Sequence, residues 1–275
     1  MLPDDFVFSQ HSLQDFVDCP YHFYLRYILG LAWPAVKAEP ILEQERRIRL
    51  GMMFHRMAHQ HFLGIPSERL TAMAADEKLR LWWRNFLESK PGDTPGNKFP
   101  EITVSARLNG WGITAKYDLL AISPDGAATI YDWKTSEGLP KRTWLKNRLQ
   151  TRVYRYLLLQ NAGRFDPRGV LDPDQIEMVY WYSNFPNQPI HFPYSAEEAE
   201  DDLVYLNTLI TKIVGMGEDE FIKTDHDKRC KYCRHRSYCD RGEEAGTFDE
   251  LPEFIDVEED YDLDLDFDQI AEIEF

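Results

Sequence analysis

The sequence contains 275 residues, 43% of them hydrophobic and 28% charged, which suits one large or two small globular domains with a sizeable core. No apolar run of transmembrane length and no basic-then-apolar leader is found, so a membrane-spanning or secreted protein is not indicated and a soluble, cytoplasmic one is expected. The net charge of −16 would argue against a polyanionic partner, but residues 243–275 hold 15 of the 47 acids and no Lys or Arg, so residues 1–242 are nearly neutral.

The first predicted elements are helical. Ser9 or Ser12 can cap a short helix that Pro20 ends or interrupts, and a second, aromatic helical segment follows. Residues 39–63 predict a long helix whose apolar stripe recurs at helical spacing: Ile48, Met52, His55, His59 and Phe62. His55 and His59 are neighbours on this stripe and could bind zinc, but the Glu of a zinc-protease helix is absent, and histidines on such a face are more often core residues.

The centre of the chain predicts a helix over 68–90, a loop over 91–100 and a meander of three antiparallel strands. Asn109-Gly110 is a strong hairpin signal between strands at 101–108 and 111–123. Further along the chain, the pattern predicts a helix over 142–162, a strand over 175–183 and an amphipathic helix over 196–215. The sequence therefore predicts a mixed α/β fold without internal repeats.

Turn chemistry sets the register of the second hairpin. Pro124-Asp125-Gly126 suits a three-residue bulged loop, and stepping outward from it places Asp118 opposite Asp132. Opposed residues point to one face with Cβ atoms roughly 5 Å apart, and Lys134 shares that face because it lies two residues further on. The two-residue loop of the first hairpin likewise sets Glu101 opposite Asp118. We expect these carboxylates and the ammonium group to form one patch.

This patch has the chemistry of a metal site. Opposed carboxylates repel each other and destabilise a hairpin, so their presence indicates a divalent cation, for which carboxylate oxygens are suitable ligands. Lys134 could orient or activate a metal-bound water, or stabilise charge that develops on a phosphate. The alternative is two unrelated acids at strand ends and a surface lysine, since an Asp-x-Lys sequence alone is a weak signal.

The segment from Gly138 to Phe165 contains basic residues and no acid. The basic residues are Lys141, Arg142, Lys146, Arg148, Arg152, Arg155 and Arg164. Next to a metal site, charge of one sign indicates phosphate binding, whereas elsewhere it would indicate a solvated helix face. In the same helix, Gln150 and Tyr154 are four residues apart and share one face.

The four cysteines fall in two places, with Cys19 at the first helix break and Cys230, Cys233 and Cys239 near residue 235. Cys-x2-Cys-x5-Cys is a metal-ligand spacing, and disulfides are not expected in a cytoplasmic protein. Four thiolates could hold zinc or an iron–sulfur cluster and would join the start of the domain to its end; buried free thiols are the alternative. The surrounding basic residues could also contact a polyanion: Lys228, Arg229, Lys231, Arg234, Arg236 and Arg241.

Taken in order, these motifs resemble a known family. The series His55, Asp118, Asp132-Trp133-Lys134 and Gln150-x3-Tyr154 resembles the RecB-type branch of the PD-(D/E)XK nucleases. The cysteine-containing segments at 12–27 and 230–239 resemble its iron–sulfur members, which include CRISPR adaptation exonucleases and the B-type nuclease subunits of helicase–nuclease complexes. The resemblance implies a restriction-endonuclease-like mixed sheet flanked by helices, with a C-terminal iron–sulfur lobe closed by Cys19. Residues 1–242 would form this nuclease domain, and residues 243–275 an acidic tail.

The resemblance also implies roles for individual residues. The ligands of Mg²⁺ or Mn²⁺ would be His55, Asp118, Asp132 and the backbone carbonyl of Trp133. Lys134 would orient the attacking water, and Gln150 and Tyr154 would support the site or contact the nucleic-acid backbone. The four cysteines would hold a 4Fe–4S cluster with a structural role, with Zn²⁺ as the less favoured occupant. Two departures are His59, where relatives often carry Glu, and the absence of a Gly-x4-Gly-Lys-Ser/Thr helicase motif.

These features predict a metal-dependent deoxyribonuclease, an exonuclease on single-stranded DNA or DNA ends in repair, recombination or defence. It would act alone or beside a helicase or another repair or defence protein. Two alternatives stay open: a catalytically silent nucleic-acid-binding subunit of a helicase–nuclease complex, and a zinc-stabilised adaptor that acts through its tail. The tail is predicted to be disordered. It would either aid solubility, or cover the basic face over 141–155, or bind a partner protein.

Overall fold

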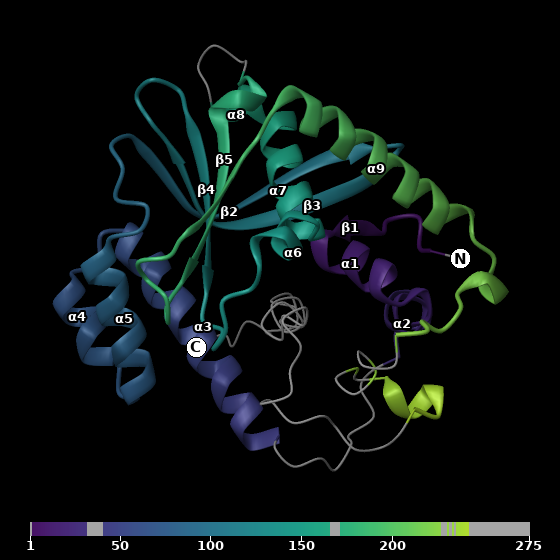
Figure 1. The fold of residues 1–275 in the computed structure, drawn as a ribbon, viewed down its shortest axis with the longest axis horizontal. Helices are drawn as coiled ribbons and strands as arrows, with labels where there is room; N and C mark the ends of the chain where they lie inside the picture. Colours follow the sequence, from purple (N-terminus) through teal and green to yellow (C-terminus); the bar gives the residue numbers. More distant parts are fainter. Residues whose placement is uncertain are drawn as a thin grey trace, which may run out of the picture.

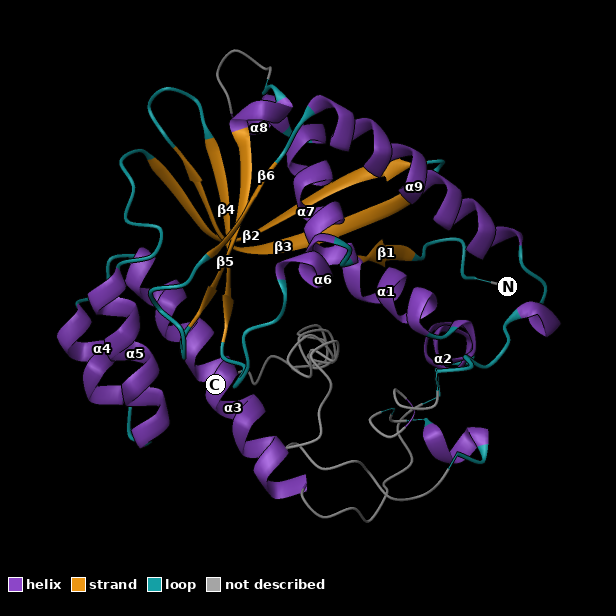
Figure 2. Cartoon of the chain, viewed as in Figure 1, coloured by secondary structure: helices purple, strands orange, loops and turns teal. Residues whose placement is uncertain are grey.

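The computed structural model describes residues 2–31, 41–165, 171–226, 230, 233 and 235–241, with the backbone alone for 41–45. The described residues form a mixed six-stranded sheet (Figure 1, Figure 2). Its strands are β1 (Val7–Ser9), β2 (Asn97–Leu108), β3 (Trp111–Ile122), β4 (Ala128–Lys134), β5 (Ile176–Tyr182) and β6 (Ile190–Pro193). The pairs β1–β3 and β4–β5 are parallel, whereas β2–β3, β3–β4 and β5–β6 are antiparallel. The predicted mixed sheet is confirmed.

Helices cover both faces of this sheet (Figure 2). One layer consists of α1 (Gln10–Asp18), α7 (Leu149–Gln160) and α9 (Ala196–Gly215), and the other of α3 (Ile41–Phe62), α4 (Ser67–Met73) and α5 (Glu77–Ser89). Shorter pieces are α2 (Pro20–Phe23) with its π-helical continuation (Tyr24–Ile28), α6 (Arg142–Lys146), α8 (Ala162–Phe165) and 3₁₀ turns at Pro173–Gln175, Glu218–Glu220 and Arg236–Cys239. Within the described ranges, no helix combines the length and the apolar character needed to cross a membrane.

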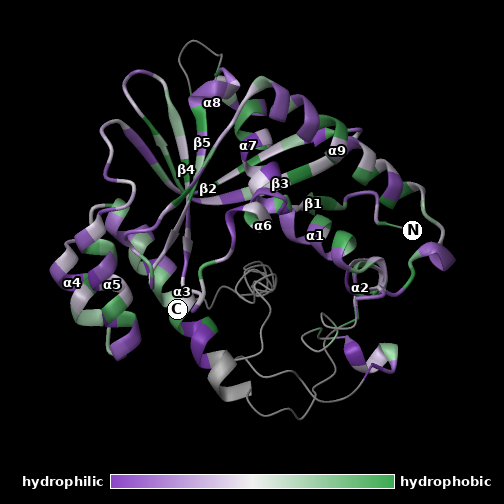
Figure 3. Ribbon diagram, viewed as in Figure 1, coloured by the Kyte–Doolittle hydropathy of each residue, from purple (hydrophilic) through white to green (hydrophobic). Residues whose placement is uncertain are grey.

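Alternation along the central strands divides the core into two clusters. Leu120 and Ile130 pack with α1, α7 and α9, whereas their neighbours Leu119 and Tyr131 pack with α3, α4 and α5. Successive side chains of a strand point to opposite faces, so a strand covered on both sides must be apolar at nearly every position. The outer helices need only one apolar face, and Figure 3 shows them in mixed polar and apolar colours.

The N-terminal helices begin where the sequence predicts. The Oγ of Ser9 accepts the N–H of Ser12 (3.2 Å), and the Oγ of Ser12 accepts the N–H of Ser9 (2.9 Å), so the two serines form a capping box for α1. Cys19 ends α1, and Pro20 begins α2 in the first turn, where the missing N–H of a proline costs no hydrogen bond. The predicted interruption at Pro20 is therefore confirmed.

Several predicted boundaries need correction. Residues 68–90 form two helices, because Asp76 accepts the N–H of Lys78 (2.8 Å) and caps α5. Residues 142–162 also divide, at Asn147 and Arg148, into α6 and α7. β2 begins at Asn97, inside the predicted loop. The sequence did not predict β1 or β6, because strands of 3 and 4 residues carry too little alternation to identify.

The buried face of α3 differs from the predicted stripe. Leu50, Phe54 and Met57 are at most 4% exposed, whereas Met52 on the predicted stripe is 42% exposed. The aromatic side chains of α5 and β5 pack against the face that carries Phe54, and this packing selects the core-facing side. The predicted core stripe is therefore wrong, and His55 lies half-buried beside the true core face.

Candidate active site

The hairpin of β3 and β4 has the predicted register. Leu119 pairs with Tyr131, and the pairing continues to the turn without a bulge. Continued by one residue in the other direction, the same register sets Asp118 opposite Asp132. A slip of one residue would send Asp132 to the other face of the sheet, so the turn decides which carboxylates meet.

Asp132 is held in a buried network of charges and hydrogen bonds. Its Oδ2 lies 3.0 Å from the Nζ of Lys134, and its Oδ1 accepts a hydrogen bond from the Nε2 of Gln150 (2.7 Å). All three residues are at most 5% exposed. A buried carboxylate is tolerated when it is paired and hydrogen-bonded, so Lys134 and Gln150 keep Asp132 in place.

Tyr154 extends this network toward the N-terminal helix. Its OH donates to the carbonyl of Lys116 (2.8 Å) and accepts a hydrogen bond from the Nε2 of Gln10 (3.2 Å). Burial raises the pKa of Tyr154 well above its ordinary value, and the Asp132 carboxylate raises it further. The phenol is therefore neutral and serves as a hydrogen-bond donor. Gln10 is a residue that sequence reasoning missed, because only the packing of α1 on α7 brings it here.

Asp118 forms the second centre of the site. Its Oδ1 lies 2.9 Å from the Nδ1 of His55 on α3, and its Oδ2 accepts the backbone N–H of Trp133 (2.7 Å). Burial by itself would raise the pKa of Asp118, but His55, the Trp133 N–H and the Lys134 ammonium outweigh it, and the pKa is lowered. Asp118 is thus an ionised carboxylate at neutral pH. The contact joins two residues that the family resemblance implies as ligands of one metal ion.

Glu101 joins His55 and Asp118 from β2. The ligand atoms of these three residues lie within 4.8 Å of one another. Glu101 has φ of +52°, a left-handed conformation that is costly for a residue with a side chain and that recurs at functional sites. Its carboxylate forms an ion pair with Lys116. The expectation that Glu101 faces the patch is confirmed, although it was not among the predicted metal ligands.

The donor set fits a hard divalent cation. His55, Glu101 and Asp118 offer an imidazole nitrogen and two carboxylate oxygens, which suit Mg²⁺ or Mn²⁺. Among the described residues, Asp132 is not part of this converging group; its oxygens contact Lys134 and Gln150 instead. Of the predicted ligands, the structure therefore brings His55 and Asp118 together and adds Glu101. The backbone carbonyl of Trp133 stays a prediction.

The predicted basic surface is divided by the structure. Lys146 pairs with Glu198 (3.0 Å), Arg152 with Asp202 (2.7 Å) and Arg155 with Glu198 (3.2 Å). Both acids belong to α9, so the charge of this segment is one-signed in the sequence but not in space. Arg155 is 2% exposed, which argues against a direct contact between Arg155 and nucleic acid. This part of the prediction is corrected, because α9 packs over the helix that carries these arginines.

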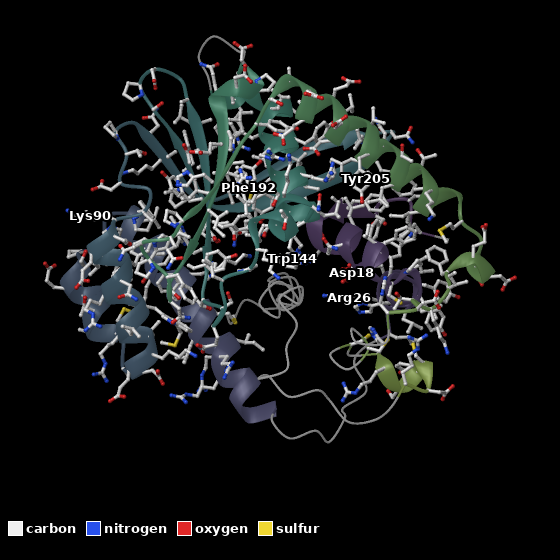
Figure 4. The ribbon with its side chains drawn as sticks, in the orientation of Figure 1. Asp18, Arg26, Lys90, Trp144, Phe192 and Tyr205 are labelled. Atoms are coloured by element: carbon white, nitrogen blue, oxygen red, sulfur yellow. The ribbon has the colours of Figure 1, made fainter. Side chains whose placement is uncertain are left out.

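Three arginines of the basic segment, Arg152 among them, lie against aromatic rings that Figure 4 labels. The guanidinium carbons of Arg142, Arg148 and Arg152 are 4.8, 4.9 and 4.7 Å from the ring centres of Phe192, Trp144 and Tyr205. Such cation–π contacts hold the side chains in place. Lys141 and Arg142 are exposed at the start of α6. These two residues keep the accessibility that a phosphate contact requires, whereas Arg148 is buried.

The cysteines come from both ends of the described chain. All four are half-buried and free of disulfides. Burial raises the pKa of the Cys239 thiol, and the thiols of Cys19 and Cys230 contribute to the same shift. The Nη1 of Arg241 lies 3.3 Å from the Cys230 Sγ. A set of neighbouring thiols suits a soft metal or an iron–sulfur cluster.

Some predicted features lie outside the described residues. These are the acidic tail over 243–275 and the basic residues Lys228, Arg229, Lys231 and Arg234. Arg236 is described, and it is buried beside the Cys233 carbonyl, which accepts its Nη1 (3.3 Å). Arg236 therefore supports the turn around the cysteines and offers little surface to a polyanion.

Comparisons with known proteins agree with this geometry. A family model described as the PD-(D/E)XK nuclease superfamily matches residues 7–240, which span every side chain of the site and all four cysteines. A candidate exonuclease from Eubacterium rectale is 13% identical, with a TM-score of 0.49, over 84% of this chain and 88% of that protein. A protein named SSO0001 is 14% identical, with a TM-score of 0.37, over 87% and 88%. At these TM-scores neither structural similarity carries weight. Among curated proteins, none matches significantly.

Proposed function

This chain belongs to the PD-(D/E)XK nuclease superfamily, and from that premise we propose that it is a metal-dependent deoxyribonuclease of the RecB-type branch. It hydrolyses phosphodiester bonds as an exonuclease on single-stranded DNA or DNA ends, in repair, recombination or defence. The observation that carries the proposal is the convergence on one hairpin of two groups of side chains. One is the buried set Asp132, Lys134 and Gln150; the other is the ligand group His55, Glu101 and Asp118.

Mg²⁺ or Mn²⁺ is the proposed cofactor. His55, Glu101 and Asp118 would hold it, with Asp132 and the Trp133 carbonyl as the further ligands that the family resemblance implies. When bound, the ion would supply Lewis-acid stabilisation of negative charge at the phosphate. The three converging donors support this proposal because they place two carboxylates, from β2 and β3, beside an imidazole from α3.

The chain's own side chains supply the remaining chemistry. Lys134 carries an ammonium group on the face of the two aspartates, where it can donate a hydrogen bond to the attacking water or to a phosphate oxygen. Gln150 holds the Asp132 carboxylate through its amide, so it is a positioning residue. Tyr154 positions β3 and α7 relative to each other through the Lys116 carbonyl. Lys141 and Arg142 are exposed and are proposed to contact the DNA backbone; Lys146 is also exposed but is paired with Glu198.

The cysteine lobe is proposed to hold a 4Fe–4S cluster through Cys19, Cys230, Cys233 and Cys239, with Zn²⁺ as the less favoured occupant. The Cys-x2-Cys-x5-Cys spacing and the electrostatic influence of Cys19 and Cys230 on the Cys239 thiol support this proposal. The cluster would have a structural role. A cross-link between residues 19 and 230 would close a loop of about 210 residues, which contributes on the order of 5 kcal/mol if the chain-entropy relation for disulfides is applied.

The test is cleavage of end-labelled single-stranded DNA by anaerobically purified full-length protein with Mg²⁺ or Mn²⁺. Asp132→Asn keeps the shape of the side chain and removes its charge, so we expect it to abolish cleavage. Glu200→Gln makes the same change on the exposed side of α9 and serves as the matched control. Label at the 5′ or the 3′ end distinguishes exonuclease from endonuclease products and gives the polarity.

The possible outcomes separate the proposal from its rival. Loss of cleavage in Asp132→Asn alone supports a nuclease at this site. Equal cleavage by both variants would show a contaminating nuclease and overturn the assignment. A folded wild-type protein that binds DNA but does not cleave it would favour the catalytically silent subunit. RNA of the same sequence, tested in parallel, determines whether the substrate is DNA.

A further inference from the structure

A second group of side chains of the types that bind metals lies away from the hairpin, where α2 meets Cys233 and His235. The ligand atoms of His22, Cys233 and His235 lie within 4.8 Å of one another. The two imidazole rings are 5.0 Å apart between centroids, and His235 is 1% exposed. His22 and the other two residues are separated by more than 200 positions in the sequence, so the group exists only in the folded protein.

Each histidine has an oxygen atom of a neighbouring residue beside one of its ring nitrogens. The Nε2 of His235 lies 3.2 Å from the carbonyl oxygen of Leu31, so this nitrogen carries the proton and Nδ1 carries the lone pair. The Nδ1 of His22 faces the Asp15 carboxylate at 3.8 Å. This partner favours a proton on Nδ1 and leaves the lone pair on Nε2. Metal-bound histidines commonly direct their second nitrogen to a carbonyl or carboxylate in this way.

Asp15 is itself held in place. Its Oδ2 accepts hydrogen bonds from the Nη1 of Arg26 (3.1 Å) and the OH of Tyr27 (3.0 Å), both from the π-helical turn after α2. Figure 4 labels Arg26 in this region of the molecule. Asp15 is therefore a fixed carboxylate rather than a mobile surface acid. The orientation of His22 depends on Asp15, Arg26 and Tyr27, which are distant in the sequence from the cysteines at 230–239.

We propose that the Nε2 of His22, the Sγ of Cys233 and the Nδ1 of His235 bind one divalent transition-metal ion of the zinc class. One thiolate and two imidazoles are a donor set that suits Zn²⁺ and Co²⁺, and three protein ligands leave a fourth position for water or another donor. The site differs in its ligands from the hairpin site, which offers carboxylates to a hard cation. It does not depend on the nuclease assignment.

Cys233 is also one of the four proposed cluster ligands. A single thiolate cannot serve the mononuclear ion and the cluster independently, so occupancy of the two sites is mutually exclusive. When the cluster is absent, the ion joins α2 to the 3₁₀ turn at Arg236–Cys239 and keeps the two chain ends together. Cys19 takes part in the cluster alone. The two sites can therefore be separated by mutation.

The experiment is a Co²⁺ titration of the full-length protein, purified aerobically, reduced and stripped of metal with a chelator. A tetrahedral site with a thiolate gives a sulfur-to-cobalt band in the near ultraviolet and visible d–d bands. We expect the sulfur-to-cobalt band to saturate at about one Co²⁺ per chain and to be abolished by Zn²⁺; Co²⁺ bound at the carboxylate site of the hairpin gives no such band. Cys233→Ser is expected to remove the sulfur band. His22→Ala and His235→Ala are expected to weaken binding at least about tenfold.

Cys19→Ser is the matched control, because it removes a thiol of the lobe that the proposed site does not use. We expect its Co²⁺ affinity and spectrum to match those of the wild type. If Cys19→Ser weakens binding as much as His22→Ala does, the ion is held by the four thiols and the proposal is wrong. Unchanged binding in both histidine variants would also overturn it. Far-ultraviolet circular dichroism checks that each variant is folded, and His22→Ala keeps the test valid if the buried His235 cannot be replaced.

Discussion

Two groups of ion pairs, one at the hairpin and one facing α9, differ in the charge that they leave uncompensated. At the hairpin, the carboxylates are Glu101, Asp118 and Asp132, and they face Lys116, Lys134 and His55. Against α9, the cations are Lys146, Arg152 and Arg155, and they face Glu198 and Asp202. With His55 neutral, the first group has an excess of negative charge that a divalent cation can neutralise. The second group has no such excess.

The comparison teaches that buried charge alone does not identify a functional site. Burial raises the pKa of Asp202, and its two arginine partners only partly oppose this, as in an ordinary structural network. At the hairpin, by contrast, donor atoms from three elements converge within 4.8 Å. The convergence of ligand atoms from α3, β2 and β3 distinguishes the two regions. Removing one buried cation from each region tests this distinction.

The largest effect is expected from Lys134→Met, which removes the ammonium group and keeps the length of the side chain. We expect a loss of cleavage of about 10²–10⁴-fold, the range for a positioned proton donor or acceptor. The free energy of unfolding should fall by about 3–5 kcal/mol, because the buried Asp132 carboxylate loses its partner. Urea unfolding and the end-labelled DNA assay measure the two effects.

The double variant Asp132→Asn/Lys134→Met is the control for this prediction. It removes both charges, so we expect it to recover most of the lost stability and none of the lost activity. A double variant that is no more stable than Lys134→Met would show that the destabilisation does not come from an unpaired carboxylate.

The second-largest effect is expected from Arg155→Met, the equivalent change at the ion pairs that face α9. Arg155 is buried and contacts Glu198 and Asp202, so its loss should lower the free energy of unfolding by about 3 kcal/mol. The DNA affinity of the folded variant should match that of the wild type. Fluorescence anisotropy at several salt concentrations measures it. A shallower salt dependence for Arg155→Met would contradict this, because it would show that Arg155 neutralises a DNA phosphate.

A smaller effect is expected from Tyr154→Phe. The variant loses the hydrogen bond to the Lys116 carbonyl, so we expect the free energy of unfolding to fall by about 1–2 kcal/mol. Burial and the Asp132 carboxylate raise the pKa of Tyr154 well above its ordinary value, so the phenol does not titrate in the range of the assay. The pH profile of cleavage should therefore keep its shape in Tyr154→Phe. A limb that disappears in the variant would assign a proton transfer to this phenol.

The smallest effect is expected from the pH dependence of stability without added metal. Burial and the Asp118 carboxylate raise the pKa of Glu101 above 4.5. Between pH 4.5 and the folded pKa, Glu101 therefore binds its proton more strongly in the folded protein than in the unfolded chain. The contribution of Glu101 to stability therefore falls as pH rises from 4.5 through the folded pKa. Glu101→Gln should remove this fall, and urea unfolding from pH 4.5 to pH 8 measures it.

Asp118→Asn is the comparison for that series, because its shift has the opposite sign. The pKa of Asp118 is lowered, so its stabilising contribution is present above 3.8 and is lost as pH falls through the folded pKa. We expect Asp118→Asn to remove the loss of stability on the acid side of the profile. Because the Asp118 carboxylate helps to raise the pKa of Glu101, this variant should also weaken the fall above pH 4.5, but burial of Glu101 should keep part of it. Identical profiles for the two variants would contradict the separate roles of the two carboxylates.

The parts of the site that the sequence predicted depend on local rules. Pro124-Asp125-Gly126 fixes a loop length, and the two-residue period of a strand then determines which residues oppose each other. For this reason Asp118, Asp132 and Glu101 could be placed on one face without any tertiary information. The break at Pro20 follows from the ring of proline in the same way.

The predictions that failed depended on contacts between distant elements. The buried face of α3 was predicted from a repeat that included Met52, but the aromatic residues of α5 and β5 select the face with Phe54 instead. The basic segment before residue 165 was read as a surface because its neutralising acids, Glu198 and Asp202, lie some forty residues further along the chain. Local periodicity contains no information about which helix will cover another.

By itself, the sequence determined the register of the hairpin and the types of ligand that this protein offers, because turn geometry and strand alternation act over a few residues. The tertiary structure alone decided which charges remain available. Packing of α9 on α7 neutralises Arg152 and Arg155, and packing of α3 on the sheet brings His55 to Asp118. The physical reason is that the electrostatic energy of a charged side chain depends on every group around it. Those groups come together only when distant segments of the chain pack against one another.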